Sequence, residues 1–177
     1  MQLGLAILVT DDVHNAMRRL QLTVAEHCGR NPALKQTPHI TIKQPFHAKA
    51  LGPVEEYFDT LVSTLERFPV RLRGIGFFEE DAVAYVGLEP DPRLERLRLR
   101  VLQGLSDRFG VRPREIEDER YRFHATLAYG LPGEQFPRVR AALAGAHVDF
   151  QFMLDTMGLF YYTGEEWIVY KRSSAAC

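Results

Sequence analysis

Two strand-like segments of the sequence carry a histidine followed two positions later by a threonine. The first reads PHITIKQPF and the second RFHATLAYG, so the pairs are His39 with Thr41 and His124 with Thr126. Since side chains alternate between the faces of a strand, each histidine shares a face with its threonine. The alternate positions are apolar, which predicts that they face the core. Both histidine faces are therefore expected to turn away from it.

These residue types suit the chemistry of a phosphodiester. One group must take a proton from the attacking oxygen, and another must give a proton to the leaving oxygen. Imidazole suits both roles because its ordinary pKa, about 6.5, lies near working pH. Hydroxyl groups can bind the non-bridging oxygens. We therefore predict His39 and His124 as an acid–base pair and Thr41 and Thr126 as phosphate-binding residues, and the sequence leaves open which histidine is the acid.

Strand alternation adds two cations to the same faces. Lys43 follows Thr41 and Arg122 precedes His124, so both are candidate phosphate-binding residues. Lys43 could equally be a solvated charge at a strand end, and Arg122 could pair with the acidic segment 115–119. Phe46 and Phe160 are candidates for stacking on a nucleobase, although aromatic residues at strand ends more often belong to a core.

The arrangement around each motif is repeated. One isolated His-x-Thr pair carries little information, because both residues are common in strands. Here each motif is followed by a predicted helix and then by a hairpin whose first strand contains Gly-x-Phe, at Gly76 to Phe78 and at Gly158 to Phe160. The spacing between the histidines nearly equals the spacing between the glycines. The repeat predicts two similar lobes, each presenting one histidine strand to a shared cleft.

The hydrophobic pattern predicts the elements that position these residues. Helices are expected where apolar residues recur at helical spacing, with Asp11 or Asp12 capping the first of them. Expected helices cover residues 11–28, 52–65, 91–109 and 134–144, and expected strands cover 3–10, 38–46, 70–78, 82–89, 122–130, 150–162 and 166–172. We predict a single bilobal α+β domain over residues 1–177, with two mostly antiparallel sheets, outer helices and pseudo-twofold symmetry.

Composition excludes several classes of function. Lys and Arg number 22 and Asp and Glu number 23, so the net charge of −1 gives no global attraction for nucleic acid or anionic membranes. No apolar run approaches the ~20 residues that span a bilayer, and the short apolar N-terminal segment is expected to be a buried strand. Cys28 and Cys177 show no metal spacing and are expected to be free thiols of a cytoplasmic protein.

The two motifs, His39-Ile40-Thr41-Ile42 and His124-Ala125-Thr126-Leu127, resemble those of the 2H phosphoesterase superfamily. This superfamily includes 2′-5′ RNA ligase-like proteins and cyclic nucleotide phosphodiesterases. The resemblance extends over nearly the whole chain, including the Gly-x-Phe strands and the late WIVY segment. It implies a bilobal fold with both motifs in a central cleft, and metal-independent cleavage of RNA-related phosphodiesters, often 2′,3′-cyclic phosphates.

We therefore expect a monomeric hydrolase that acts on 2′,3′-cyclic phosphates or 2′-5′ linkages of RNA ends or small nucleotides. It is expected to need no cofactor and no metal: His47 lies near the first motif, but no Cys or Asp joins the histidines at ligand spacing. One alternative is 2′-5′ RNA ligation, the reverse reaction at the same site. The other is a non-catalytic module that binds RNA ends or nucleotides, which would not need two proton-transfer groups.

Overall fold

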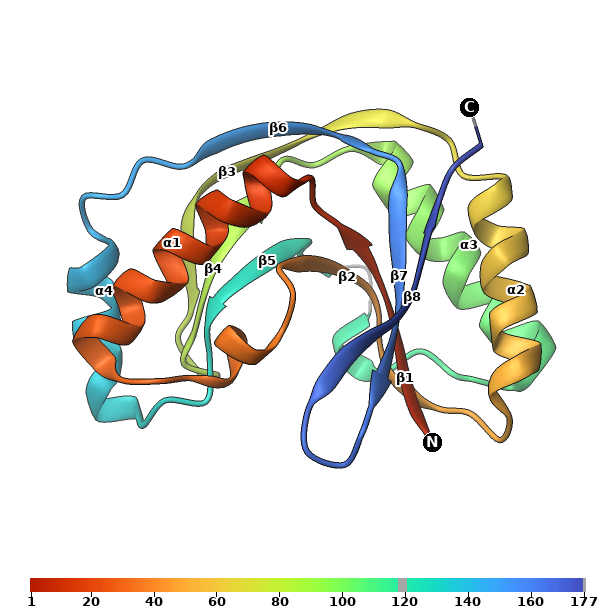
Figure 1. Ribbon diagram of the computed structural model, residues 1–177, viewed down its shortest axis with the longest axis horizontal. Helices are drawn as coiled ribbons and strands as arrows, with labels where there is room; N and C mark the ends of the chain where they lie inside the picture. The colour runs from red at the N-terminus through yellow and green to blue at the C-terminus, as the bar shows by residue number, and fades with distance from the viewer. Residues whose placement is uncertain (118–120, 177) are drawn as a thin grey trace.

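The computed structural model describes residues 1–117 and 121–176 and forms an α+β fold (Figure 1). Among these residues the strands are β1 (Gln2–Leu8), β2 (His39–His47), β3 (Phe68–Phe78), β4 (Val83–Leu88), β5 (His124–Ala128), β6 (Asp149–Leu154), β7 (Thr156–Tyr162) and β8 (Trp167–Ser174). The α-helices are α1 (Asp11–Cys28), α2 (Leu51–Ser63), α3 (Pro92–Phe109) and α4 (Phe136–Leu143). No helix of the described residues is long and apolar enough to cross a membrane.

The strands form one curled antiparallel sheet in the order β6-β3-β4-β5-β2-β1-β7-β8. The expected pair of sheets corresponds to its two four-stranded parts: the β5 half (β6, β3, β4 and β5) and the β2 half (β2, β1, β7 and β8). Between β2 and β5 the paired position is Ile40 with Ala125. The α+β class is thus confirmed, and the two sheets are joined where the two histidine strands meet.

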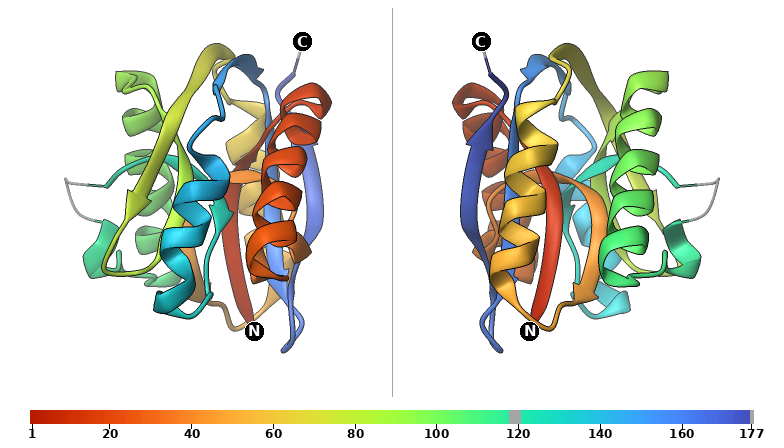
Figure 2. Two further views of the ribbon diagram at one scale, coloured as in Figure 1. Left: turned by 90° about the vertical axis from the view of Figure 1, so that its left-hand side faces the viewer. Right: turned by 90° about the vertical axis from the view of Figure 1, so that its right-hand side faces the viewer.

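Helices α1 and α3 each cover the half of the sheet to which their neighbouring strands in the sequence do not belong (Figures 1 and 2). Helix α1 connects β1 and β2 of the β2 half, yet it packs against α4 and β5. Helix α3 connects β4 and β5 of the β5 half, yet it contacts β2, while α2 contacts β7 and β8. Each half therefore depends on a helix that belongs, along the chain, to the other half.

Apolar stripes on the helices build the core, as their spacing predicts. In α1 the buried side chains include Val13, Met17 and Val24, and in α3 they include Leu94 and Val101. Burying each such side chain contributes roughly 1.5–3 kcal/mol relative to exposure.

The helix ends match the predictions in part. Asp91 caps α3 as expected, accepting a hydrogen bond of 2.7 Å from the backbone N–H of Arg93. The cap of α1 was expected at Asp11 or Asp12 but lies at Thr10, with both aspartates inside the first turn. There the negative charges of both aspartates interact favourably with the positive end of the helix dipole. Cys28, at the end of α1, is buried and free, whereas Cys177 lies outside the described residues.

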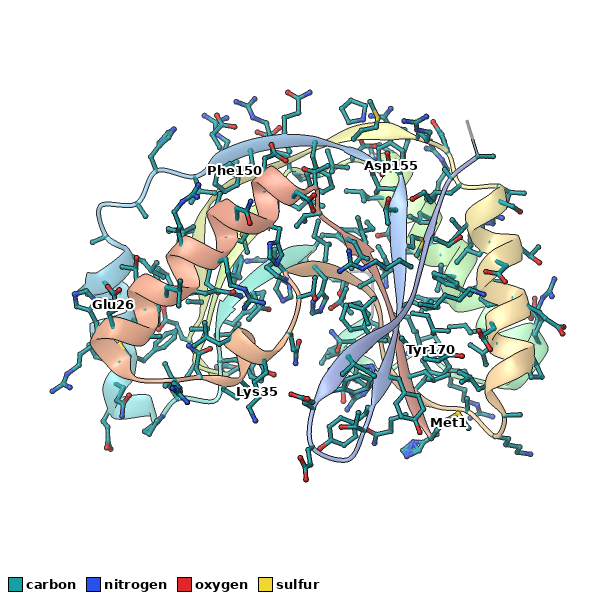
Figure 3. The ribbon with its side chains drawn as sticks, viewed as in Figure 1. Met1, Glu26, Lys35, Phe150, Asp155 and Tyr170 are labelled. Atoms are coloured by element: carbon teal, nitrogen blue, oxygen red, sulfur yellow. The ribbon has the colours of Figure 1, made fainter. Side chains whose placement is uncertain are left out.

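The expected single strand 150–162 is in fact two strands. It divides at Asp155 (Figure 3), so that β6 pairs with β3 in the β5 half and β7 pairs with β1 and β8 in the β2 half. The burial pattern agrees with this division, because β6 alternates as an edge strand does, whereas β7 is buried at four successive positions. One continuous apolar segment thus links the two halves.

Candidate active site

The concave side of the sheet holds a cavity of about 930 Å³ that both His-x-Thr motifs line. The structure brings together His39 and Thr41 from β2 with His124 and Thr126 from β5. Their apolar neighbours Ile40, Ile42, Ala125 and Leu127 are each at most 1% exposed and face the core. The alternation of the two strands therefore places all four polar side chains on the cavity face.

The pairing of Ile40 with Ala125 sets how these side chains face one another. In an antiparallel ladder, the neighbours of a paired position also lie across from each other. His39 is thereby placed opposite Thr126, and Thr41 opposite His124. The two histidines are then diagonal neighbours across the two strands, and residues in this relation lie roughly 7–8 Å apart. A tetrahedral phosphate group is of suitable size to lie between them.

Both imidazoles are held in the same way. The Nδ1 of His39 lies 2.7 Å from the carbonyl oxygen of Thr37, and the Nδ1 of His124 lies 2.7 Å from that of Arg122. A carbonyl oxygen can only accept, so each Nδ1 carries the hydrogen. In the neutral ring, Nε2 then keeps its lone pair and can accept a proton. The backbone carbonyl two residues upstream of each histidine thus selects the tautomer that leaves Nε2 able to accept a proton.

Burial lowers the pKa of both histidines. For His39, loss of solvation is the main cause, and the charge of His124 lowers the pKa further, while the hydrogen bond to Thr37 opposes the shift. For His124, burial again lowers the pKa and the hydrogen bond to Arg122 partly offsets it. Burial thus favours the neutral forms, and an anion bound between the rings would favour protonation.

An aromatic ring supports each histidine. Phe160 of β7 lies with its ring centroid 4.7 Å from that of His39. Phe78 of β3 lies 5.1 Å from His124, and Tyr85 lies 5.3 Å from it. Both phenylalanines come from the Gly-x-Phe segments, and each contacts the histidine of the other sequence repeat. The lobes of the structure therefore exchange their hairpins relative to the lobes that the repeat predicted.

The two aromatic candidates differ in where the structure places them. Phe160 lines the cavity, although the residue is only 4% exposed and belongs to a small apolar cluster with Ala6 and Leu8. Phe46 is 5% exposed and packs in the main hydrophobic core. Both are buried in apolar clusters, and of the two only Phe160 borders the cavity.

Lys43 lies in a different environment from the one that strand alternation suggested. Its side chain is 1% exposed, and its ammonium lies 2.6 Å from Glu117. The same carboxylate accepts hydrogen bonds from the backbone N–H groups of Gln44 and Arg114, at 2.8 Å each. Lys43 borders the cavity, but its charge is matched by Glu117. Its position fits a support for β2 better than a direct phosphate contact.

Arg122 has an exposed side chain and lines the cavity. Its backbone carbonyl is the group that holds His124. Of the acidic segment that was considered as its partner, Glu117 pairs with Lys43, and residues 118–119 lie outside the described residues. Arg122 therefore stays a candidate for contact with an anion.

Two further residues that sequence reasoning missed hold the motif threonines. The hydroxyl of Tyr121 donates to the carbonyl oxygen of Thr41 at 2.8 Å, and the buried amide of Gln21 donates to that of Thr126 at 3.1 Å. Each motif strand thus has a side-chain donor fixing its backbone next to the histidine. Neither residue belongs to a motif, and no spacing in the sequence connects them to the strands.

The search for a metal site covers residues 1–117 and 121–176. No group of three or more His, Cys, Asp or Glu side chains there is arranged to hold a metal ion.

Both His-x-Thr motifs lie on central strands of one sheet and line one cavity, as the resemblance to the 2H phosphoesterases implies. The family model of the 2′-5′ RNA ligase superfamily matches residues 9–166. The chain belongs to that superfamily, and the resemblance seen in the motifs is confirmed.

Curated relatives support the same class. The chain is 29% identical over 133 residues to a Staphylococcus saprophyticus protein named "Putative phosphoesterase SSP1770", covering 73% of this chain and 74% of the relative. It is 28% identical over 143 residues to "Putative phosphoesterase GK0864" of Geobacillus kaustophilus, covering 76% of each. These names are consistent with a phosphoesterase.

Solved structures share the fold. The protein TT0787 of Thermus thermophilus matches with a TM-score of 0.64 at 17% identity, covering 98% of this chain and 97% of that one. E. coli LigT complexed with NADP⁺ matches with a TM-score of 0.61 at 17% identity, covering 99% and 98%. At this identity the likeness establishes the architecture.

Proposed function

We propose that the protein hydrolyses phosphodiesters of RNA ends or small nucleotides, with 2′,3′-cyclic phosphates and 2′-5′ linkages as substrates, by acid–base catalysis between His39 and His124. The observation that carries this proposal is the matched anchoring of the two rings. Each Nδ1 donates to a backbone carbonyl at 2.7 Å, which leaves each Nε2 for proton transfer at one cavity.

The proposed reaction needs one proton transfer at each side of the phosphorus atom. The hydroxyls of Thr41 and Thr126 would donate to the non-bridging oxygens and hold the phosphate between the rings. One neutral imidazole accepts the proton of a water molecule as its oxygen bonds to phosphorus. The other, protonated, gives its proton to the ribose oxygen as the P–O bond breaks. The two rings end with exchanged protonation states, and solvent restores them.

Nucleotides are the substrates that the comparisons favour. Superfamily members of known structure include E. coli LigT complexed with 3′-AMP and with ATP. The cavity of about 930 Å³ lies in the range of small-molecule sites and can hold a mononucleotide. The net charge of −1 provides no broad basic surface for a long RNA, which favours a short substrate or a chain end.

The test is hydrolysis of 2′,3′-cyclic AMP and of a 2′-5′ linked diadenylate, with products separated by chromatography. We expect His39→Ala and His124→Ala each to lower kcat by about 10²–10⁴-fold, the usual contribution of a general acid or base. Circular dichroism must show that both variants are folded, and EDTA should leave the rate of the wild-type protein unchanged. Near-normal turnover in either folded variant would refute the proposal.

Ligation is the second candidate, because the matched family model carries that activity in its description. The same acid–base pair could join two RNA ends when a 5′-hydroxyl replaces water as the nucleophile: its oxygen bonds to the phosphorus of the cyclic phosphate, and the bond from phosphorus to the 3′ oxygen breaks. Supplying RNA fragments with 2′,3′-cyclic and 5′-hydroxyl ends distinguishes the two activities. A protein that binds these ends without turning them over would instead be a binding module. We further propose that the protein acts as a monomer in the cytoplasm, which light scattering and cell fractionation can test.

A further inference from the structure

The ladder between the two motif strands is short, so contacts outside it must help to arrange the two motifs. Among the described residues β2 and β5 pair at one position, Ile40 with Ala125, whereas each strand pairs at several positions with its other neighbour. A backbone hydrogen bond contributes only about 0.5–1.5 kcal/mol net. The pair sets where β2 and β5 meet, and the angle between them depends on the groups on either side.

Arg18 of α1 holds segments that belong to both motifs. Its guanidinium donates to the backbone carbonyl oxygens of Ala33, Leu34 and Gln36, at 3.4, 3.0 and 2.8 Å. It also donates to the side-chain oxygen of Gln21 at 2.8 Å. In the part of the chain that the structure describes, every hydrogen-bond acceptor of this guanidinium is uncharged. An arginine that spans several carbonyl oxygens fixes their geometry, because its planar fork of donors is rigid.

One arm of this network reaches His39. Gln36, whose carbonyl Arg18 holds, precedes Thr37, and the carbonyl oxygen of Thr37 anchors the Nδ1 of His39 at 2.7 Å. The side chain of Gln36 also donates to the hydroxyl of Tyr129, one residue past the end of β5, at 2.7 Å. The short segment that orients the His39 ring is therefore held both from α1 and from the chain that follows β5.

The second arm reaches the other motif. Gln21 is only 1% exposed, and both ends of its amide are used. The oxygen accepts from Arg18 at 2.8 Å, and the nitrogen donates to the carbonyl oxygen of Thr126 at 3.1 Å. Leaving either end of a buried amide without a partner costs roughly 1–3 kcal/mol, so this orientation is strongly preferred. Thr126 follows His124 by two residues in β5, so the guanidinium that holds the approach to β2 also holds β5.

Arg18 acts on the two imidazoles unequally. The carbonyl that anchors His124 belongs to Arg122, just before β5, whereas the backbone bonds of the guanidinium end on the approach to β2. His39 therefore depends on Arg18 for the direction of its ring, and His124 depends on it for the position of its strand. The Arg18 side chain lies outside the cavity lining that the described residues form, so it does not meet a ligand there.

We propose that Arg18 is a positioning residue, which aims the ring of His39 through Gln36 and fixes the second motif through Gln21. The geometry of proton transfer in the cavity thus depends on a guanidinium outside it. The inference rests on the proposed function for the reaction that this geometry serves. The tautomer of each ring can be measured without turnover, so the inference can also be tested separately.

The tautomers provide the first test. Nuclear magnetic resonance correlations between the ring protons and the ring nitrogens distinguish protonation at Nδ1 from protonation at Nε2, and His39→Gln and His124→Gln assign the signals. At about pH 8, where both rings are neutral, the wild-type rings should carry the hydrogen on Nδ1. In Arg18→Met the His39 signals should shift toward a mixture of both tautomers, whereas those of His124 keep the wild-type pattern. Unchanged His39 signals, or equal shifts of both rings, would overturn the inference.

Kinetics provide the second test. A displacement of about 1 Å can cost about 10²-fold in rate, so Arg18→Met should lower kcat for 2′,3′-cyclic AMP by about 10–100-fold. KM should change much less, because no group that binds the phosphate is removed. The matched control is Arg19→Met, at an exposed position of the same helix, which should leave kcat, KM and both ring signals unchanged. An unchanged kcat in folded Arg18→Met, or an equal loss in the control, would overturn the inference.

A milder variant is available if circular dichroism shows that Arg18→Met is unfolded. Arg18→Lys then replaces it in both tests. A flexible ammonium cannot hold the oxygens of Gln21 and Gln36 in the fixed fork of a guanidinium, so the same changes are expected with smaller size. Wild-type His39 signals together with a wild-type kcat in Arg18→Lys would overturn the inference.

The two measurements separate the inference from the proposed function. Hydrolysis by the wild-type protein with unchanged His39 signals in Arg18→Met refutes only the positioning role. A selective shift of the His39 signals in Arg18→Met, without hydrolysis of any substrate by the wild-type protein, refutes only the proposed hydrolase. Absence of both the hydrolysis and the shift refutes both.

Discussion

Ile40 of β2 lies directly opposite Ala125 of β5, and this pair joins the two halves of the sheet at the position between the motif histidines and threonines. Both side chains are fully buried, at 0% exposure. The distance between the proposed acid and base is therefore set by the packing under one residue pair. Changes beneath the cavity should affect catalysis without touching the substrate.

Enlarging Ala125 tests this relation. Ala125→Leu inserts methylene groups into a filled space, which typically costs about 1–3 kcal/mol of stability. Because the inserted atoms push β2 from β5, we also expect kcat for 2′,3′-cyclic AMP to fall at least tenfold. Ala84→Leu is the matched control, since Ala84 is equally buried but lies in β4, away from the β2–β5 pair. The relation is wrong if both variants lose stability and activity to the same extent.

The lowered pKa values of His39 and His124 predict an acidic optimum for kcat/KM. The proposed mechanism requires one protonated and one neutral ring, so activity should decline once the pH exceeds the higher of the two pKa values. Burial lowers both below their ordinary value, so the decline should begin below about pH 6.5. The bound anion favours protonation, so the optimum of kcat should lie at higher pH than that of kcat/KM. A kcat/KM optimum above about pH 7 would contradict this prediction.

The same shifts predict how stability depends on pH. The folded protein binds fewer protons at His39 and His124 than the unfolded chain does, because burial lowers both pKa values. Above the pKa of the unfolded chain, about 6.5, both histidines are neutral in the folded and the unfolded state, so their burial makes no pH-dependent contribution to stability. As the pH falls from there through the folded pKa values, the unfolded chain binds protons first and the folded protein loses stability. In urea unfolding, His39→Gln with His124→Gln should lose less stability between about pH 7.5 and 5.5 than the wild-type protein. The exposed His27, changed to Gln, serves as the control.

The buried ion pair of Lys43 and Glu117 should matter for stability more than for phosphate binding. Removing one partner leaves the other charge buried, which costs about 3–5 kcal/mol. Lys43→Met and Glu117→Gln should each be destabilising in urea unfolding, and the double variant should lose less than the sum of both. The comparison is Arg122→Met, at an exposed position, which should raise KM and change stability by at most about 0.5 kcal/mol. Should Lys43→Met raise KM at unchanged stability, Lys43 binds substrate instead.

Much of the architecture was predictable because two periodicities are strong in this sequence. Helical spacing indicated α1 and α3 close to their observed ends, and strand alternation put Ile40 and Ala125 in the core with the histidines on the other face. Alternation reports only which face a side chain takes, however. It could not reveal that Glu117 covers Lys43, since that contact joins segments far apart in the sequence.

Long-range pairing explains the other differences. The segment around Asp155 reads as one strand because its apolar character continues across that residue, and only the partners of β6 and β7 divide it. Tyr121 and Gln21 support the motif backbones from a loop and a helix, where no local pattern marks them.

The exchange of α1 and α3 between the halves bears on how the protein can be divided. A fragment ending before α3 would retain β1 and β2 but lack the helix that covers β2, and the complementary fragment would lack α1, which covers β5. Each fragment would expose an apolar sheet surface and aggregate, so neither repeat is an autonomous folding unit. Reassembly from two separately expressed pieces would require both to fold around each other at once.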